Sequence, residues 1–222
     1  MNRMERYLRA TPTIDCDNES IKGKAHELAK GQKKNIDKAI NIFYFVRDEI
    51  KYNPYVLTDL LEYYPASRTL EKGEGFCIQK AVLLAALARA AGIPARLRFA
   101  DIVNHLIPDK LLELMETNLF TYHGYDELYI EGRWIKATPA FDLRMCQETR
   151  IIPVEFDGKS HATFHSHDQG GNLHIEYVQD HGHYEDLPLD KILHAAVQTH
   201  GPDYSERVMQ LIETRKSVKT SQ

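Results

Sequence analysis

The residue types best suited to covalent chemistry in this chain are one cysteine and one histidine. Cys77 follows the glycine-containing loop 73–76 and opens a run that stays largely apolar until Gly92 and Pro94. This run predicts a buried helix that begins at Cys77 and is apolar on nearly every face. Free N–H groups at a helix N-terminus favour a thiolate, which is the nucleophilic form of cysteine. Cys77 is therefore a candidate nucleophile, and a core helix that begins with a buried cysteine is the alternative.

His123 is the candidate general base. It begins the segment 123–130, which the turn pair Glu131-Gly132 separates from the segment 133–137, and this pattern predicts a β-hairpin. A thiol nucleophile needs a base within hydrogen-bond reach and a third group that orients the base. A helix that starts at Cys77 and packs on a strand that carries His123 supplies the first two. His105, after the preceding predicted strand, is an alternative base.

The elements that must position these side chains fall in the order helices first, then strands. Helices are predicted over about 20–30, 35–51 and 77–91, in a short segment after Pro108, and over about 188–199 and 204–216. Strands are predicted over 95–103, in the hairpin and over 173–178. Residues 52–72 are predicted to form a long loop with at most one helical turn. The order predicts an α+β fold in which the buried helix packs on an antiparallel sheet.

The two motifs together resemble the transglutaminase-like superfamily of cysteine enzymes. That family has Gly-x-Gly-x-Cys at the head of an apolar helix, as at 73–77. Further along the chain it has a histidine, an aromatic residue, a glutamate, a glycine and a tryptophan, which match His123, Tyr125, Glu127, Gly132 and Trp134. The resemblance covers roughly residues 35–142. It implies a papain-like α+β core and thiol acyl chemistry, which is transamidation, deamidation or peptide hydrolysis.

The resemblance also divides the chain. Residues 1–34 are predicted to form an N-terminal segment with one helix, residues 35–142 the transglutaminase-like catalytic core, and residues 143–222 a C-terminal extension packed on the core. Hydrolysis or deamidation is favoured over protein cross-linking, because nothing in the sequence suggests a second amine-binding domain or a calcium site. The expected substrate is a peptide or a small amide.

The third member of the expected triad departs from the family pattern. The family has an aspartate before a proline after the tryptophan strand, and Thr138 occupies that position here. A threonine hydroxyl can orient an imidazole but carries no charge to stabilise an imidazolium. Asp142 is the first candidate for the orienting group, and a turn or surface carboxylate is its alternative role. Since an amide in place of the aspartate costs ~10⁴ in rate in a comparable triad, a non-catalytic binding or scaffold module is the rival hypothesis.

Three further residues of the motif are candidate substrate-binding groups. Tyr125 and Glu127 share a strand face with His123 by the period of two, so Glu127 either pairs with a cation near the site or is solvated. Trp134 either forms a wall of the substrate site or belongs to the core. The backbone N–H of Cys77 is the expected oxyanion donor.

The histidine-rich segment 161–183 raises a third hypothesis, a metal-binding protein. His165-Ser166-His167 with Asp168 could hold an ion, but the spacing fits no defined zinc pattern and cysteine ligands are lacking, so no metal and no cofactor are predicted. The extension that carries this segment is expected to pack beside the active-site loops and to limit substrate access.

The composition restricts the partners and the compartment. A net charge of −4 gives no support to nucleic-acid binding, and the absence of a long apolar run gives none to a membrane partner. Three widely spaced cysteines indicate a reducing compartment in which Cys16 and Cys146 are inert thiols. Without an apolar N-terminal segment, a cytoplasmic location is expected. The oligomeric state is not predicted.

Overall fold

The chain folds around a four-stranded antiparallel sheet. The computed structural model describes residues 4–55, 61–203 and 206. The strands lie in the order β5-β4-β3-β6, with bounds β3 Ala95–Asn104, β4 Leu119–Ile130, β5 Arg133–Ala137 and β6 Ile175–Tyr184. A separate parallel pair consists of β1 (Lys51–Tyr52) and β2 (Glu74–Gly75).

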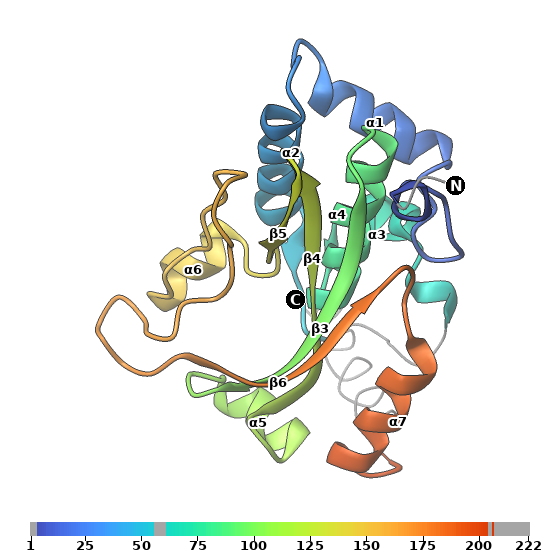
Figure 1. Ribbon diagram of the computed structural model, residues 1–222. Coiled ribbons are helices and arrows are strands. Elements are labelled where there is room, and N and C mark those ends of the chain that lie inside the picture. The colour runs from blue at the N-terminus through green and yellow to red at the C-terminus, as the bar shows by residue number, and fades with distance from the viewer. Residues whose placement is uncertain (1–3, 56–60, 204–205, 207–222) are drawn as a thin grey trace, which may run out of the picture.

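Helices cover the sheet at two places. The α-helices are α1 (Glu19–Ala29), α2 (Asn35–Tyr44), α3 (Ala66–Lys72), α4 (Cys77–Ala90), α5 (Asp109–Met115), α6 (Leu143–Thr149) and α7 (Leu189–His200). Figure 1 shows α1 to α4 gathered behind the upper part of the sheet, with α5 and α7 near its lower end. None of the described helices combines the length and the apolarity that a membrane crossing requires. The arrangement confirms the predicted α+β class, with a buried helix on an antiparallel sheet.

The helix α4 is the centre of the core, as predicted from its apolar sequence. Every residue from 78 to 89 is buried, and the helix packs on β3 and β4 as well as on α1, α2 and α3. A helix surrounded on all sides buries most of its apolar area, which makes it a rigid support for the residue at its first position. Cys77 is that residue.

Two buried basic side chains tie α4 to its neighbours. Lys80 has no exposed surface, and its amino group donates to the carbonyl oxygens of Arg47 at 2.9 Å and Ile50 at 2.5 Å. The Arg89 guanidinium donates to three carbonyl oxygens, those of Arg9, Ala95 and Glu185. Both side chains therefore satisfy carbonyl groups at the ends of other elements and fix the position of α4 along its axis.

The hairpin and the last strand are longer than the sequence predicts. Glu131 and Gly132 both have positive φ, at 50° and 85°, as a type I′ turn requires. The strand β6 pairs with β3 from Leu97 to Asn104, so the C-terminal extension supplies the fourth strand of the sheet. Pairings between residues so far apart in sequence leave no local pattern from which the sheet order can be predicted.

Two helices were missed, and one predicted helix ends in a π-helical turn. The helix α3 occupies the end of the predicted loop 52–72, and only Ala66 and Thr69 of its seven residues are buried, which leaves too little apolar periodicity to detect. The helix α6 buries only Cys146. In the predicted helix 35–51, residues 45–49 (η2, Phe45–Glu49) form a π-helical turn after α2. The helix expected over 204–216 lies outside the described residues.

Candidate active site

Cys77 begins α4 directly after the short parallel strand pair. The Asn53 N–H donates to the Gly75 carbonyl oxygen at 3.0 Å, which extends the pairing of β1 and β2. Across the first turn of α4, the Phe76 N–H donates to Gln79 Oε1 at 3.3 Å. A Cβ on residue 75 would lie 3.0 Å from Gln79 Cβ, so this close approach needs glycine. The loop therefore places Cys77 at the helix N-terminus, as the sequence predicts.

Burial decides the charge of Cys77. It raises the pKa of the thiol from 9.0 to about 11, although the N–H groups of Gly124 and Ile78 lower it. A helix N-terminus contributes typically 0.3–1 kcal/mol, about one pKa unit at most, and desolvation exceeds it here. Burial therefore opposes the thiolate that the helix N-terminus favours, and the neutral thiol is the favoured resting form.

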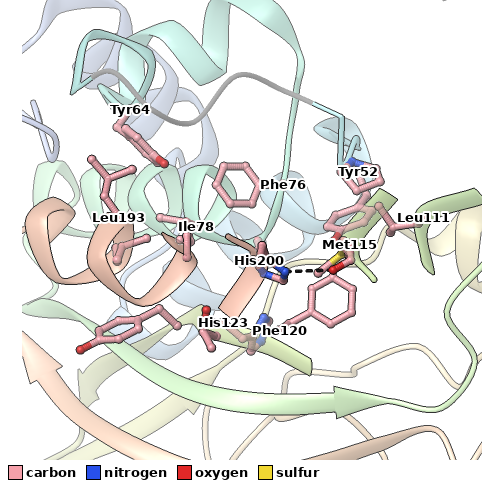
Figure 2. Close-up of a pocket in the computed structure, with 16 residues that line it drawn as sticks. Tyr52, Tyr64, Phe76, Ile78, Leu111, Met115, Phe120, His123, Leu193 and His200 are labelled. Carbon is pink, nitrogen blue, oxygen red and sulfur yellow. Dashed lines mark hydrogen bonds between the residues drawn. The ribbon is translucent and has the colours of Figure 1, made fainter. Parts of the chain in front are cut away.

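His123 reaches the same place from β4. A Cβ on the next residue, Gly124, would lie 3.1 Å from Ile78 Cα, so glycine allows β4 to pack closely against the first turn of α4. The structure thereby brings Cys77 and His123 to one cavity, which both side chains line. Figure 2 shows His123 at the lower edge of this cavity, among mostly apolar and aromatic side chains.

Aromatic rings enclose His123. Its ring centroid lies 4.9 Å from that of Phe164, 6.0 Å from that of Tyr125 and 6.4 Å from that of Tyr177. The residue is 3% exposed, and none of the described residues forms a hydrogen bond with Nε2. This burial lowers the pKa of His123 from 6.5 to about 3. The resting imidazole is therefore neutral, with one ring nitrogen that can take a proton.

The structure gives Asp142 a different role from the predicted one. Its Oδ1 accepts the Met145 N–H at 2.8 Å and caps α6, and its Oδ2 accepts the Tyr52 N–H at 2.8 Å. No hydrogen bond joins Asp142 to His123. The prediction that this carboxylate orients His123 is corrected accordingly: Asp142 ties the end of η2 and β1 to the segment after β5.

Thr138 does not orient the imidazole either. The residue is 1% exposed, and its hydroxyl forms no hydrogen bond of normal geometry with any described residue. The hydroxyl lies beside that of Tyr177, which in turn accepts the Phe164 N–H at 3.4 Å. Among the described residues, no carboxylate therefore contacts His123 at the position where the family pattern has its aspartate.

Sequence reasoning missed the two aromatic residues of the C-terminal extension that enclose His123. Phe164 lies in a turn-rich segment without periodicity, and Tyr177 lies in the predicted strand that becomes β6. The strand pattern around Tyr177 was the usable signal, since it predicts a strand there. The contact of Tyr177 with His123 depends on the pairing of β6 with β3, which the local pattern does not show. The extension thus supplies part of the site itself.

A second histidine supports the backbone immediately before His123. Tyr122 has a left-handed φ of 52°, next to an irregularity in the pairing of β3 with β4. Asp101 Oδ1 accepts the Tyr122 N–H at 2.9 Å and contacts His181 Nε2 at 2.7 Å. The His181 ring stacks on the Tyr122 ring, with centroids 4.0 Å apart. These contacts hold a conformation that is strained for a residue with a side chain.

None of the three predicted substrate-binding residues lines the cavity. Glu127 shares the strand face of His123, as predicted, but it is paired with Arg96 at 2.7 Å and Arg98 at 3.1 Å. Tyr125 lies against the His123 and Tyr177 rings. Trp134 packs on the rings of Tyr7 and Tyr129 and on the Arg96 guanidinium. It is half-buried, lies outside the hydrophobic core and does not line the cavity, so it has neither of its two predicted roles.

The histidine-rich segment holds its side chains apart. No group of three or more His, Cys, Asp or Glu side chains that could hold one ion occurs within residues 4–55, 61–203 and 206. Asp168 closes a turn by accepting the N–H groups of Gly170 and Asn172 at 2.8 Å each. The alternative base His105 contacts Glu176 at 3.4 Å and does not line the cavity.

The family can now be stated. A model of the transglutaminase-like superfamily matches residues 22–139, which is more than half of the chain. The chain therefore belongs to the transglutaminase-like superfamily. The matched range contains both Cys77 and His123.

One solved structure agrees in fold. The chain is similar to a provisionally assigned cysteine protease from Cytophaga hutchinsonii, with 18% identity and a TM-score of 0.52 over 84% of this chain and 48% of that one. A weaker similarity links it to a provisionally assigned protease from Parabacteroides distasonis, with 17% identity and a TM-score of 0.41 over 61% of this chain and 25% of that one. Another links it to the periplasmic domain of TgpA from Pseudomonas aeruginosa, with 21% identity and a TM-score of 0.44 over 61% of this chain and 46% of that one. A search of curated proteins gave no match. The chain spans about half the length of the first of these structures.

Proposed function

We propose that this protein is a thiol enzyme that acts on peptide or amide bonds through a thioester on Cys77, by hydrolysis, deamidation or acyl transfer. One observation carries the proposal: the first residue of the buried helix α4 and a histidine of β4 line the same cavity. Membership of the transglutaminase-like superfamily supports the chemistry class. The substrate is expected to be a peptide or a small amide.

Each side chain has a defined task in this proposal. Cys77 Sγ attacks the carbonyl carbon while His123 accepts the thiol proton, so that the negative charge develops only as the S–C bond forms. The leaving amine departs with a proton from His123. Water or a second amine then attacks the thioester and frees Cys77. The Cys77 N–H is the proposed oxyanion donor.

The neutral resting pair fits attack with concerted proton transfer. With a thiol pKa of about 11 and an imidazole pKa of about 3, a charged thiolate–imidazolium pair is disfavoured before substrate binds. A substrate that brings polar groups beside Cys77 reduces the desolvation that raises the pKa of the thiol and lowers the pKa of the imidazole.

Release of ammonia or amine from a panel of peptides and carboxamides tests the proposal, with wild-type protein and Cys77→Ala compared. The wild type should release product, and Cys77→Ala should not. The variant Cys146→Ala, which alters a buried thiol of α6, is the matched control and should retain activity. Equal release by wild type and Cys77→Ala would overturn the assignment of the nucleophile.

One observation favours a second candidate function, a non-catalytic binding module. Within the part of the chain that the structure describes, His123 Nε2 has no hydrogen-bond partner and no carboxylate orients the ring. An imidazole without an orienting group is a less effective general base, because its tautomer and position are not fixed. In that case binding of peptides or amides should persist in Cys77→Ala while no substrate of the panel is turned over by the wild type.

A further inference from the structure

The cavity beside Cys77 is built from elements on both sides of the catalytic pair. The helices α5 and α7 contribute Leu111, Met115, Ile192, Leu193 and Ala196, β1 contributes Tyr52, and the segments after β1 and β2 contribute Tyr64 and Phe76. Figure 2 shows Tyr64, Phe76, Leu193 and Tyr52 around the space above His123. His200 also lines the cavity, and its Nδ1 contacts the Met115 carbonyl oxygen at 3.2 Å.

The described part of the lining carries no formal charge. Among the described residues that line the cavity there is no Asp, Glu, Lys or Arg, and its polar atoms belong to the Cys77 thiol, to two imidazoles and to a few hydroxyl and backbone groups. A charged side chain that entered this space would lose its hydration without gaining an ionic partner, which is costly. An apolar group gains from the same transfer.

The size of the space fits a side chain and not only a solvent molecule. The cavity volume is about 110 Å³, whereas one water needs about 10–15 Å³ on the same scale. Several heavy atoms therefore fit, as many as the side chain of a leucine or a phenylalanine contains.

From these observations we infer that the cavity is the acyl-donor site of the enzyme and selects substrates with a large, uncharged aliphatic or aromatic side chain next to the reacting carbonyl. The inference rests on the proposed function, because it places the acyl carbon at Cys77. It adds the class of substrate, which the family and the fold leave open. The helix α7 lies outside the range that the family model matches, so the selectivity is a property of this chain.

Three alkylating probes of different character test the selectivity directly on Cys77. They are iodoacetamide, N-hexyl iodoacetamide and iodoacetate, and each forms a bond between Sγ and the probe CH₂ group while iodide leaves and the thiol proton is lost. Rates at Cys77 are measured by peptide mapping and divided by the rates with glutathione. The normalised rate with N-hexyl iodoacetamide should exceed that with iodoacetamide by about tenfold to a hundredfold, since a buried alkyl chain gains that much. Iodoacetate should be the slowest.

A matched pair of variants on α7 locates the effect. Leu193 lines the cavity, whereas Val197, one turn further on the same helix, is 50% exposed and does not. Leu193→Lys should lower the hexyl preference at least tenfold and raise the rate with iodoacetate, and Val197→Lys should change neither. If Leu193→Lys fails to fold, Ala196→Phe partly fills the same space and should lower the hexyl preference alone.

The outcomes separate this inference from the proposed function. If Cys77 reacts with iodoacetamide and turns over amides but shows no hexyl preference, the acyl-donor site is wrong and the thiol enzyme stands. If Val197→Lys changes the preference as much as Leu193→Lys does, the cavity is not the cause and the inference fails. If no amide is turned over while the hexyl preference is present and lost in Leu193→Lys, the cavity binds apolar groups but the proposed function fails.

Discussion

The rate at which iodoacetamide alkylates Cys77 should rise about tenfold for each unit of pH between 7 and 9.5. Burial raises the pKa of this thiol to about 11, so the thiolate fraction at pH 7 is about 10⁻⁴. At the ordinary value of 9.0 it would be about 10⁻², so burial lowers the reactive fraction roughly a hundredfold. Because only the thiolate reacts with iodoacetamide, the logarithm of the rate follows pH with unit slope until the pKa is approached.

The assay is peptide mapping after timed exposure to iodoacetamide across this pH range. His123→Phe keeps an aromatic ring in place of the imidazole and serves as the comparison. In both proteins the slope should be close to one, because His123 with a pKa of about 3 is neutral throughout. A rate that reaches a plateau at or below pH 7 in the wild type, and loses the plateau in His123→Phe, would show a resting thiolate–imidazolium pair and refute this reasoning.

Three further predictions concern the supports of the site. Asp142→Ala should lower the free energy of unfolding by about 2–4 kcal/mol in urea titrations, because it removes the α6 cap and the acceptor of the Tyr52 N–H; unchanged stability would contradict the capping role. Stability should fall as pH drops from 6.5 toward 3, by up to roughly 1.4 kcal/mol per unit, because the unfolded chain protonates His123 and the folded one does not; acid titration of His123→Phe should show a shallower loss. Asp101→Ala should slow acylation of Cys77 about tenfold, because the Tyr122 N–H loses its acceptor; an unchanged rate would show that Asp101 does not position His123.

The main parts of the site could be predicted because their signals are local. The apolar run after Cys77 has one interpretation, a buried helix, and the structure has that helix at 77–90. The turn pair Glu131-Gly132 fixes the hairpin and with it the strand that carries His123. Chain order and turn chemistry were sufficient for these elements.

The supports of the site could not be predicted, because they depend on contacts between distant segments. Whether Asp142 reaches an imidazole or a backbone N–H depends on where Tyr52 lies, 90 residues earlier. The Tyr177 ring reaches His123 only because β6 joins the edge of β3. The charge of Cys77 depends on how closely β4 and the surrounding side chains cover it, and a helix N-terminus alone does not reveal that burial.

The most direct test of the central claim is acylation of Cys77 by an activated ester. The protein is mixed with N-acetyl-leucine p-nitrophenyl ester, and nitrophenol release is followed together with the mass of the Cys77 peptide. A thioester forms as nitrophenolate leaves, so the wild type should give a burst of one equivalent and an acylated Cys77 peptide. Cys77→Ala should give no burst, and His123→Ala should slow it by at least about a hundredfold. A burst of the same size in Cys77→Ala, or acyl groups only on other residues, would contradict the claim.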